Sequence, residues 1–375
     1  MALAAAVDFQ GSDTVRPLRV LALPHYGQQG ASSRMRSWQY FPVMREAGVH
    51  VEVQALIDDA TLLDRYKVGS YRLVSVLKWY ALRVAALFGR EKFHLLWIEK
   101  EALPWVPLWF ELILLRRVPY VLDFDDAVFH NYDQHRFAVV RRLYGLRLDR
   151  LMAKAALVVC GNQYLADRAK SAGARRVEVL PTVIDLVRYP APLLPNSLPT
   201  NEVATIVWIG SPSTAKYLQM LQKPLQLLAQ RMNFVFRIIG AEFQIPGVQV
   251  ECVPWTEATE VACIAACQVG VMPLQDSAWE RGKCGYKLIQ YMACSLPVVA
   301  SPIGVNTEIV QHGVNGYLAN TTAEWVDALE ALLTDSALRS RMGKAGRQAV
   351  EDKYCIQKTW PKMAELLKEA AQGVH

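Results

Sequence analysis

Residues 279–306 read WERGKCGYKLIQYMACSLPVVASPIGVN, a loop rich in glycine and lysine followed by a helical pattern, an apolar run and a second loop. Gly282 and Gly285 leave backbone N–H groups uncovered where the helix is expected to begin, which favours an anion. Lys283 and Lys287 add two positive charges one helical turn apart. The apolar run is typical of a buried strand in a parallel sheet. The stretch therefore predicts a phosphate site at the carboxyl end of such a sheet, with a capped, solvated turn as the plainer alternative.

The composition fits a globular protein with two domains. The chain has 375 residues, of which 52% are hydrophobic and 20% are charged, which is enough for two separate cores. Residues 1–190 hold 26 Lys and Arg against 19 Asp and Glu (+7), whereas residues 191–375 hold 15 against 16 (−1). We therefore expect the first half to meet an anionic surface, and we expect no nucleic-acid partner.

The cysteines and the apolar stretches predict a cytoplasmic protein. Seven cysteines without metal-ligand spacing are expected to be reduced core residues, so we predict neither a metal nor a cofactor. Residues 1–10, MALAAAVDFQ, lack the basic start of a signal peptide. The best candidate span, residues 102–115, is interrupted by Pro104, Pro107 and Glu111 and is shorter than the roughly 20 residues that a bilayer requires.

Strand and helix patterns alternate along both halves of the chain, which predicts an α/β fold with two Rossmann-like domains. Four prolines in and beside residues 191–201 indicate a linker between residues 1–190 and a second domain that starts at residue 202. The expected strands are residues 18–23, 49–56, 95–98, 120–122, 156–160, 177–180, 204–209, 234–239, 248–252, 270–273 and 297–300.

The order of the motifs GKCGYKLIQYMAC, SLPVVAS, IGVN and HGVNGYLA resembles the donor-binding half of bacterial GT-B glycosyltransferases of the family 4 type. The resemblance implies that a second domain, residues 202–355, holds a nucleotide diphosphate sugar across a cleft from a first, acceptor-binding domain. It implies that residues 356–375 form a helix that returns to the first domain. It also implies transfer with retention and without a metal. The basic and aromatic character of the first domain adds the expectation of a lipid-linked or saccharide acceptor, as in cell-surface polysaccharide biosynthesis.

The motif WIGSPSTAKYL occupies the place where members of this family contact the donor diphosphate with a Gly, an Arg and a Lys. Gly210 and Lys216 match the pattern, whereas Ser211 stands in the place of the arginine. A fixed cation beside the departing diphosphate stabilises the charge that develops as the glycosidic bond breaks. Lys216 is therefore a candidate catalytic residue, with a plain surface lysine as the alternative.

Family members often carry two glutamates separated by seven residues, the second of which holds the ribose. Here Gln290 and Gly282 occupy those two positions, and an amide keeps only part of the strength of a carboxylate. Glu280 or Asp276 is expected to contact the sugar from a shifted loop. Trp255 is expected either to bind the base or to belong to the core.

The segment DFDDAVFH, residues 123–130, places three carboxylates after an apolar strand, where we expect them to face the cleft. Adjacent like charges are costly unless they function or pair with cations. By resemblance Asp125 takes the position of a histidine near the reacting carbon, and Asp126 that of the following aspartate. The alternatives are a capping cluster neutralised by Arg141 and Arg142, or the Asp-x-Asp metal motif of single-domain GT-A enzymes.

The loop PHYGQQGASSRMR follows the first expected strand. Gly27 and Gly30 lack the third glycine of the dinucleotide fingerprint, which argues against a dehydrogenase. By resemblance the loop faces the cleft, where Arg34 and Arg36 would hold donor phosphate or acceptor. Exposed helix charges are the alternative for these two arginines.

One long helix is expected over residues 65–92, with a basic and aromatic stripe along one face. Such a stripe suits an anionic membrane, and the neighbouring residues 103–115 add tryptophans and leucines, so we predict a protein that can dock at the inner face of the cytoplasmic membrane. A solvated helix face is the alternative. The stripe residues are Arg65, Arg72, Trp79, Arg83 and Arg90.

Two other functions are compatible with the motifs. One is an epimerase or hydrolase with the GT-B fold, which would act on the nucleotide sugar without an acceptor. The other is a scaffold that binds nucleotide sugar without turnover, because Ser211, Gln290 and Asp125 all depart from the family pattern.

Overall fold

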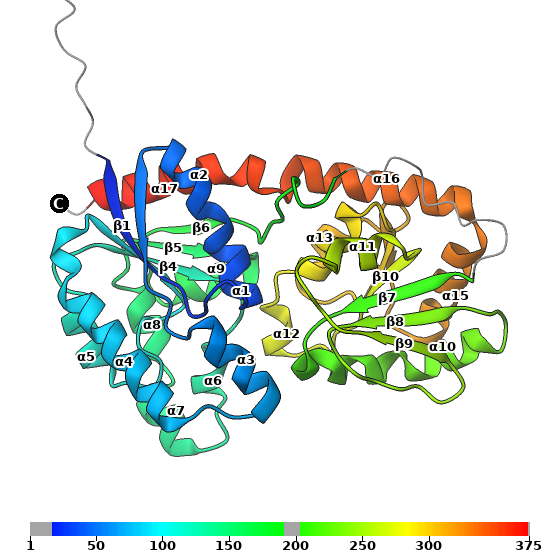
Figure 1. Ribbon diagram of the computed structural model, residues 1–375, viewed down its shortest axis with the longest axis horizontal. Coiled ribbons are helices and arrows are strands. Elements are labelled where there is room, and N and C mark those ends of the chain that lie inside the picture. Colours follow the sequence, from blue (N-terminus) through cyan, green and yellow to red (C-terminus); the bar gives the residue numbers. More distant parts are fainter. Residues whose placement is uncertain (1–16, 191–202, 374–375) are drawn as a thin grey trace, which may run out of the picture.

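The computed structural model describes residues 17–190 and 203–373, which form two α/β domains, each built on a six-stranded parallel sheet (Figure 1). The expected fold class is confirmed. The expected linker, residues 191–201, and the N-terminal residues 1–10 lie outside the described residues.

The first domain has the strand order β2-β1-β3-β4-β5-β6. Its central strands are buried because apolar side chains cover both faces of the sheet. The strands are β1 (Leu18–Leu23), β2 (Val49–Val53), β3 (Leu95–Glu99), β4 (Tyr120–Phe124), β5 (Leu157–Cys160) and β6 (Val177–Val179). The helices are α1 (Ala31–Arg36), η1 (Trp38–Tyr40), α2 (Phe41–Glu46), α3 (Asp59–Val68), α4 (Leu73–Phe88), η2 (Arg90–Lys92), α5 (Leu108–Leu114), α6 (His130–Asp133), α7 (Ala138–Tyr144), α8 (Arg147–Met152) and α9 (Gln163–Ser171).

The second domain repeats this plan with the strand order β12-β11-β10-β7-β8-β9. Its strands are β7 (Thr205–Ile209), β8 (Val235–Ile239), β9 (Gln249–Val253), β10 (Val269–Met272), β11 (Val298–Ala300) and β12 (Gly316–Leu318). Its helices are η3 (Pro212–Leu221), α10 (Gln222–Ala229), α11 (Glu260–Ala265), α12 (Ala278–Arg281), α13 (Tyr286–Ala293), α14 (Asn306–Ile309), α15 (Thr322–Thr334) and α16 (Ser336–Lys353).

The last helix, α17 (Ile356–Gln372), continues from α16 and lies along the first domain (Figure 1). The hydroxyl groups of Tyr40 and Thr359 lie 2.9 Å apart, and Arg176 pairs with Glu369 at 2.7 Å. The chain therefore joins its two domains a second time through this helix. Among the described residues, no helix combines the length and the apolar character needed to cross a bilayer.

The expected long helix over residues 65–92 is two helices, α3 and α4. Gly69 ends α3 in the left-handed conformation (φ 82°), and its N–H donates to the carbonyl oxygen of Arg65. A glycine at this position is the usual end signal of a helix, so the single-helix prediction was wrong.

The expected membrane-facing stripe is also wrong, because the break after α3 changes which residues share a face. Trp79 and Arg83 on α4 are buried. The Arg83 guanidinium donates to the carbonyl oxygens of Pro24 at 2.8 Å and Gln54 at 3.0 Å. These carbonyl groups satisfy the arginine inside the domain, while the apolar side of α4 faces outward.

Candidate functional site

The two domains meet at the carboxyl ends of their sheets, where α/β folds bind ligands. The thiol of Cys284 donates to the carbonyl oxygen of Asp125 at 3.0 Å. The Asn162 side-chain amide, which also caps α9, donates to the carbonyl oxygens of Gly282 at 2.9 Å and Lys283 at 3.0 Å. The loop before α13 and the loop after β4 are therefore in direct contact across the cleft.

Helix α13 begins at Gly285, which has a left-handed conformation (φ 66°). A Cβ atom there would lie 2.4 Å from Cδ1 of Ile309, so only glycine fits this close turn. The start of the helix carries partial positive charge, and the two lysines of the loop add to it.

Lys283 and Lys287 lie beside the two carboxylates of the opposite domain. Lys283 Nζ is 3.5 Å from Asp126 Oδ1, and the Lys283 side chain is 18% exposed. Desolvation and the charge of Lys283 lower the pKa of half-buried Lys287 to about 8. An anion bound here would reverse both effects, because it would replace lost hydration and screen the two charges from each other.

Asp125 belongs to a charged network that sequence reasoning missed. Lys100 Nζ lies 2.9 Å from Asp125 Oδ1, 3.2 Å from Glu99 Oε1 and 2.8 Å from Ser32 Oγ. Ser32 Oγ also contacts the Asp125 carboxylate. Lys100 itself has a positive φ of 64°, a strained conformation of the kind that is found at functional sites.

The pKa values of the two adjacent carboxylates shift in opposite directions. Burial alone would raise the pKa of Asp125, but the charge of Lys100 opposes burial, and the pKa lies below its ordinary value. Burial raises the pKa of Asp126, and Lys283 only partly opposes this. A pair of carboxylates separated in this way can divide the roles of charged and protonated group.

The sequence does contain a signal for this network. Glu99 and Lys100 stand at the end of β3, and Ser32 lies in α1, which follows β1. Because the strand order is β1-β3-β4, the carboxyl ends of these three strands are neighbours. The strand expected over residues 95–98 ends one residue short of Glu99, so the charged pair that follows was not predicted to belong to the site.

Asp123 and Arg36 do not face the cleft, contrary to the sequence prediction. Asp123 lies inside β4, where the buried Arg36 guanidinium pairs with its carboxylate at 2.7 Å. Arg36 also donates to the carbonyl oxygen of Leu180 at 2.8 Å, which fixes it in the core. The Asp-x-Asp metal hypothesis is therefore wrong on geometry, because Asp123 and Asp125 have separate cationic partners. The hypothesis of a single domain is equally wrong.

The carboxylates are not neutralised by Arg141 and Arg142 either. Both arginines are exposed on α7, and Arg141 donates to the carbonyl oxygens of His135 and Arg136. The cations that pair with the three aspartates are Arg36, Lys100 and Lys283.

In the loop with Gly27 and Gly30, two N–H groups already bind a carboxylate of the protein. The backbone N–H groups of Gln28 and Gln29 donate to Asp59 at 3.2 and 2.8 Å. A Cβ atom on Gly27 would lie 2.3 Å from the same carboxylate. This part of the expected phosphate loop is thus filled by Asp59.

Arg34 reaches the second domain. Its guanidinium lies 4.9 Å from the centre of the Trp255 ring, a cation–π contact between the domains. Its Nε atom is buried and, among the described residues, has no hydrogen-bond partner. A buried charged donor without a partner is costly, so this atom is available to an anionic ligand.

Lys216 and Glu280 are neighbours at the mouth of the second domain. Lys216 is exposed on η3, with Nζ 5.0 Å from the centre of the Tyr217 ring. The Tyr217 and Ser277 hydroxyl groups both donate to the buried Glu280 carboxylate. Burial raises the pKa of Glu280, but these two hydrogen bonds lower it more, so the group stays ionised near Lys216. Glu280 therefore ties η3 to the loop before α13.

The remaining residues discussed as contacts of the nucleotide sugar are Gly210, Ser211 and Asp276. Gly210 follows β7 directly, and Ser211 starts η3 with its hydroxyl 2.9 Å from that of Ser213. Asp276 is exposed and pairs with exposed Arg281 at 2.7 Å, so its carboxylate already has a cationic partner.

Gln290 uses its amide N–H group in a hydrogen bond within the protein, and its contact with the ribose stays a prediction. The residue is 3% exposed, and its Nε2 donates to Tyr189 Oη at 3.1 Å. Tyr189 Oη in turn donates to the buried Glu260 at 2.7 Å, which also accepts from Trp255 Nε1 at 2.6 Å. Gln290 supports Trp255 from behind through this chain of hydrogen bonds.

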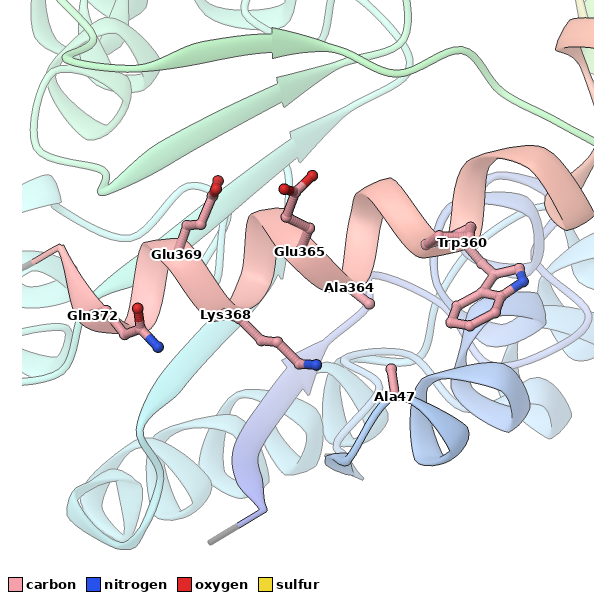
Figure 2. Close-up of a pocket in the computed structure, with 8 residues that line it drawn as sticks. Ala47, Trp360, Ala364, Glu365, Lys368, Glu369 and Gln372 are labelled. Carbon is pink, nitrogen blue, oxygen red and sulfur yellow. The ribbon is translucent and has the colours of Figure 1, made fainter. Parts of the chain in front are cut away.

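A separate hollow of about 380 Å³ lies between α17 and α2, with Trp360, Lys368 and Ala47 along it (Figure 2). Charged groups on this stretch of α17 pair within the protein: Glu369 with Arg176 and Glu365 with Lys362. It brings together none of the residues described above and lies on the helix that spans the first domain.

Comparison with known proteins confirms the resemblance that the motifs suggested. Residues 203–335 match the family model described as Glycosyl transferases group 1. D-inositol 3-phosphate glycosyltransferase from Pseudarthrobacter chlorophenolicus is 32% identical over 120 residues, which cover 32% of this chain and 27% of that relative. N-acetyl-alpha-D-glucosaminyl L-malate synthase from Bacillus anthracis is 32% identical over 81 residues, 21% of either chain. The matches thus span under a third of these relatives.

Solved structures share the fold over nearly the whole chain. Sucrose-phosphate synthase from Thermosynechococcus elongatus aligns with a TM-score of 0.68 at 13% identity, covering 95% of this chain and 100% of that one. HepE from Anabaena, in complex with UDP-glucose, aligns with a TM-score of 0.67 at 16% identity, covering 94% of this chain and 100% of that one. The arrangement of two domains is that of the GT-B fold.

Proposed function

We propose that this chain, whose residues 203–335 match the group 1 glycosyl transferases, transfers a sugar from a nucleotide diphosphate donor to an acceptor hydroxyl group. One observation carries the proposal. Lys283, in the loop before α13, lies 3.5 Å from Asp126, the residue after Asp125, so a cationic phosphate site and a half-buried acidic pair share one cleft. This arrangement provides both halves of a transfer reaction, a place for the leaving group and a place for the acceptor.

The second domain stabilises the leaving diphosphate in this proposal. Lys283, Lys287 and the N–H groups at the start of α13 face the charge that builds on the diphosphate oxygen as its bond to the anomeric carbon breaks. Lys216 supplies a further cation from η3, in the absence of the arginine that Ser211 replaces. From the first domain, Arg34 adds its Nε–H group as a hydrogen-bond donor to the diphosphate.

The first domain orients the acceptor. Asp125, kept ionised by Lys100 at 2.9 Å, accepts a hydrogen bond from the acceptor hydroxyl and aims its oxygen at the anomeric carbon. The new carbon–oxygen bond forms on the face from which the diphosphate leaves. As the hydroxyl group attacks, its hydrogen bond shifts from Asp125 to the departing diphosphate oxygen, which takes the proton. This front-face route gives retention of configuration and requires no metal ion.

The donor and acceptor classes follow from chemistry and comparison. The structural neighbour HepE is described in complex with UDP-glucose, which supports a nucleotide sugar as donor. We propose a lipid-linked or free saccharide as acceptor, and a place in cell-surface polysaccharide assembly at the inner face of the cytoplasmic membrane. The mixed apolar and basic surface of the first domain supports a lipid-linked acceptor.

Binding and turnover can be tested separately. A panel of nucleotide sugars in a thermal-shift assay should contain one that stabilises the protein by roughly 2.7 kcal/mol at 100 times its dissociation constant. Release of nucleoside diphosphate should then depend on added acceptor. Release without any acceptor would favour the epimerase or hydrolase, and binding without turnover on membrane extracts would favour the scaffold.

Closure of the cleft should be required for transfer. A Cβ atom on Gly161 would lie 2.3 Å from Cys284 Sγ, so Gly161→Val is expected to hold the domains apart and to slow transfer by about a hundredfold. Steady-state kinetics and the radius of gyration from X-ray scattering check this. Gly89→Ala, whose nearest atom would be Ala86 O at 3.6 Å, is the matched control. An unchanged kcat in Gly161→Val would refute the requirement.

A further inference from the structure

The outer side of the first domain exposes an unusual number of large apolar side chains. Of eighteen such side chains exposed in the described residues, twelve lie on α4, α5, α7 or the loops directly before or after them. Single exposed apolar residues are normal, whereas a contiguous group marks an interaction surface. The twelve are Leu73, Val74, Leu77, Leu82, Phe88, Trp105, Trp109, Ile113, Phe137, Val139, Leu143 and Leu146.

Helix α4 exposes large apolar side chains although it buries an arginine. Arg83 is buried and Trp79 packs inside, while Val74, Leu77 and Phe88 are 79%, 62% and 68% exposed. These three residues recur at helical spacing, so they form one stripe, with Lys78 as a charged neighbour on it. A helix that exposes three of its four leucines while it buries an arginine is suited to face an apolar medium.

The three helices meet around the loop before α5. Tyr80 on α4 donates to the carbonyl oxygen of Pro104 at 2.7 Å, and Tyr144 on α7 donates to that of Trp105 at 3.2 Å. Trp105 also packs on Tyr132 of α6, with ring centres 4.7 Å apart. Figure 1 shows α4, α5 and α7 together on the side of the first domain away from α17. The apolar groups therefore belong to one surface.

Exposed positive charge lies beside this surface, on α7 and the segment before it. Residues 134–148 contain four arginines and neither aspartate nor glutamate. Arg147 is buried and pairs with Glu101 and Glu111, whereas Arg136, Arg141 and Arg142 are exposed. Tryptophan, leucine and arginine side by side are what the interface of an anionic bilayer binds, with apolar groups entering the acyl boundary and arginines contacting the headgroups.

We infer that the outer faces of α4, α5 and α7 form a docking surface for an anionic lipid bilayer. A second copy of the chain fits less well, because the face is self-complementary in its apolar groups but would bring like-charged arginines together. The surface adjoins the cleft, because α6 and α7 follow the Asp125 loop directly along the chain. The docking itself does not depend on the proposed function. Which acceptor the docked protein would meet does rest on it.

The charge contribution is tested with Arg141→Glu/Arg142→Glu. We expect affinity for vesicles of phosphatidylglycerol and phosphatidylcholine to fall at least about tenfold in a sedimentation assay, since each basic residue contributes near an anionic surface. Arg341→Glu/Lys344→Glu on α16 changes the net charge equally and should bind like wild type. The inference would be overturned if the wild-type protein does not bind these vesicles, or if Arg141→Glu/Arg142→Glu binds them as tightly as wild type.

The apolar contribution is tested with Leu77→Gln/Phe88→Gln, which alters two exposed side chains and should leave folding intact. Affinity for the same vesicles should fall about tenfold. Binding of the nucleotide sugar is measured on the same samples and should be unchanged. If vesicle binding persists while no nucleotide sugar binds, docking stands and the proposed function fails. Concentration-dependent dimers that these substitutions abolish, without vesicle binding, would overturn docking in favour of a second copy.

Discussion

Replacing Asp125 with asparagine is expected to slow sugar transfer by about a thousandfold, while the affinity for the nucleotide sugar changes only a few-fold. The amide keeps the shape of the carboxylate but cannot accept the acceptor hydroxyl with a full negative charge. It also leaves Lys100, now 2.9 Å from a neutral group, with Glu99 as its charged partner. Steady-state kinetics give kcat, and calorimetry gives the dissociation constant of the donor.

Asp149→Asn is the matched control for this variant. Asp149 pairs with Arg168 at 2.7 Å in the first domain and lies away from the acidic tip of β4, so its loss should leave kcat nearly unchanged. If Asp125→Asn retains activity within tenfold of wild type, Asp125 does not orient the acceptor, and its ion pair with Lys100 is only structural.

The pH dependence of transfer separates a chemical role of Lys100 from a purely structural one. Lys100 is the main cause that lowers the pKa of Asp125, so the ionised carboxylate, and with it activity, persists to a pH below the ordinary range. In Lys100→Met the pKa should rise, and activity should be lost at a higher pH as the solution is acidified. Lys100→Arg should restore the wild-type acid limb, whereas an unchanged limb in Lys100→Met would contradict the role.

The fold could be predicted because its signals are local. Buried parallel strands are continuous apolar runs, and those at residues 95–98, 120–122 and 298–300 are visible without tertiary information. The end of α3 was missed although Gly69 signals it, because the apolar pattern continues on both sides of the glycine. A pattern of hydrophobicity places helices better than it places their ends.

The site could be predicted only where its residues follow each other in the chain. Lys283 and Asp126 came from two such motifs, and their contact follows from strand ends that face one cleft. The partners of charged residues were less predictable. Arg36 turned inward to Asp123, and Lys100 was overlooked, because pairing depends on which strands are neighbours. The orientation of α4 was hidden for a related reason: backbone carbonyl groups, which carry no sequence signal, bind Arg83.

Substitution of Lys283 by alanine is expected to lower kcat by about a hundredfold, the usual effect of removing one preorganised charge from a leaving-group site. Lys283 is held 3.5 Å from Asp126 before the donor arrives, so its position costs little reorganisation during the reaction. Its loss should also raise the pKa of Lys287 above about 8, because the two ammonium groups repel each other. If Lys287 compensates, the activity lost in Lys283→Ala relative to wild type should not be largest at alkaline pH. A loss that is largest at alkaline pH would mean that Lys287 fails to compensate.

Lys287 provides the test of that compensation. If the two lysines share the diphosphate, Lys283→Ala/Lys287→Ala should lose more activity than the product of the single effects, since each single variant leaves a better-charged partner. Lys223→Ala, an exposed lysine on α10 of the same domain, should behave like wild type. Kinetics of nucleoside diphosphate release are measured for the wild type and each of these variants. Activity within a few-fold of wild type in both Lys283→Ala and Lys216→Ala would mean that the charge on the leaving group is stabilised elsewhere, and the start of α13 would lose its assigned role.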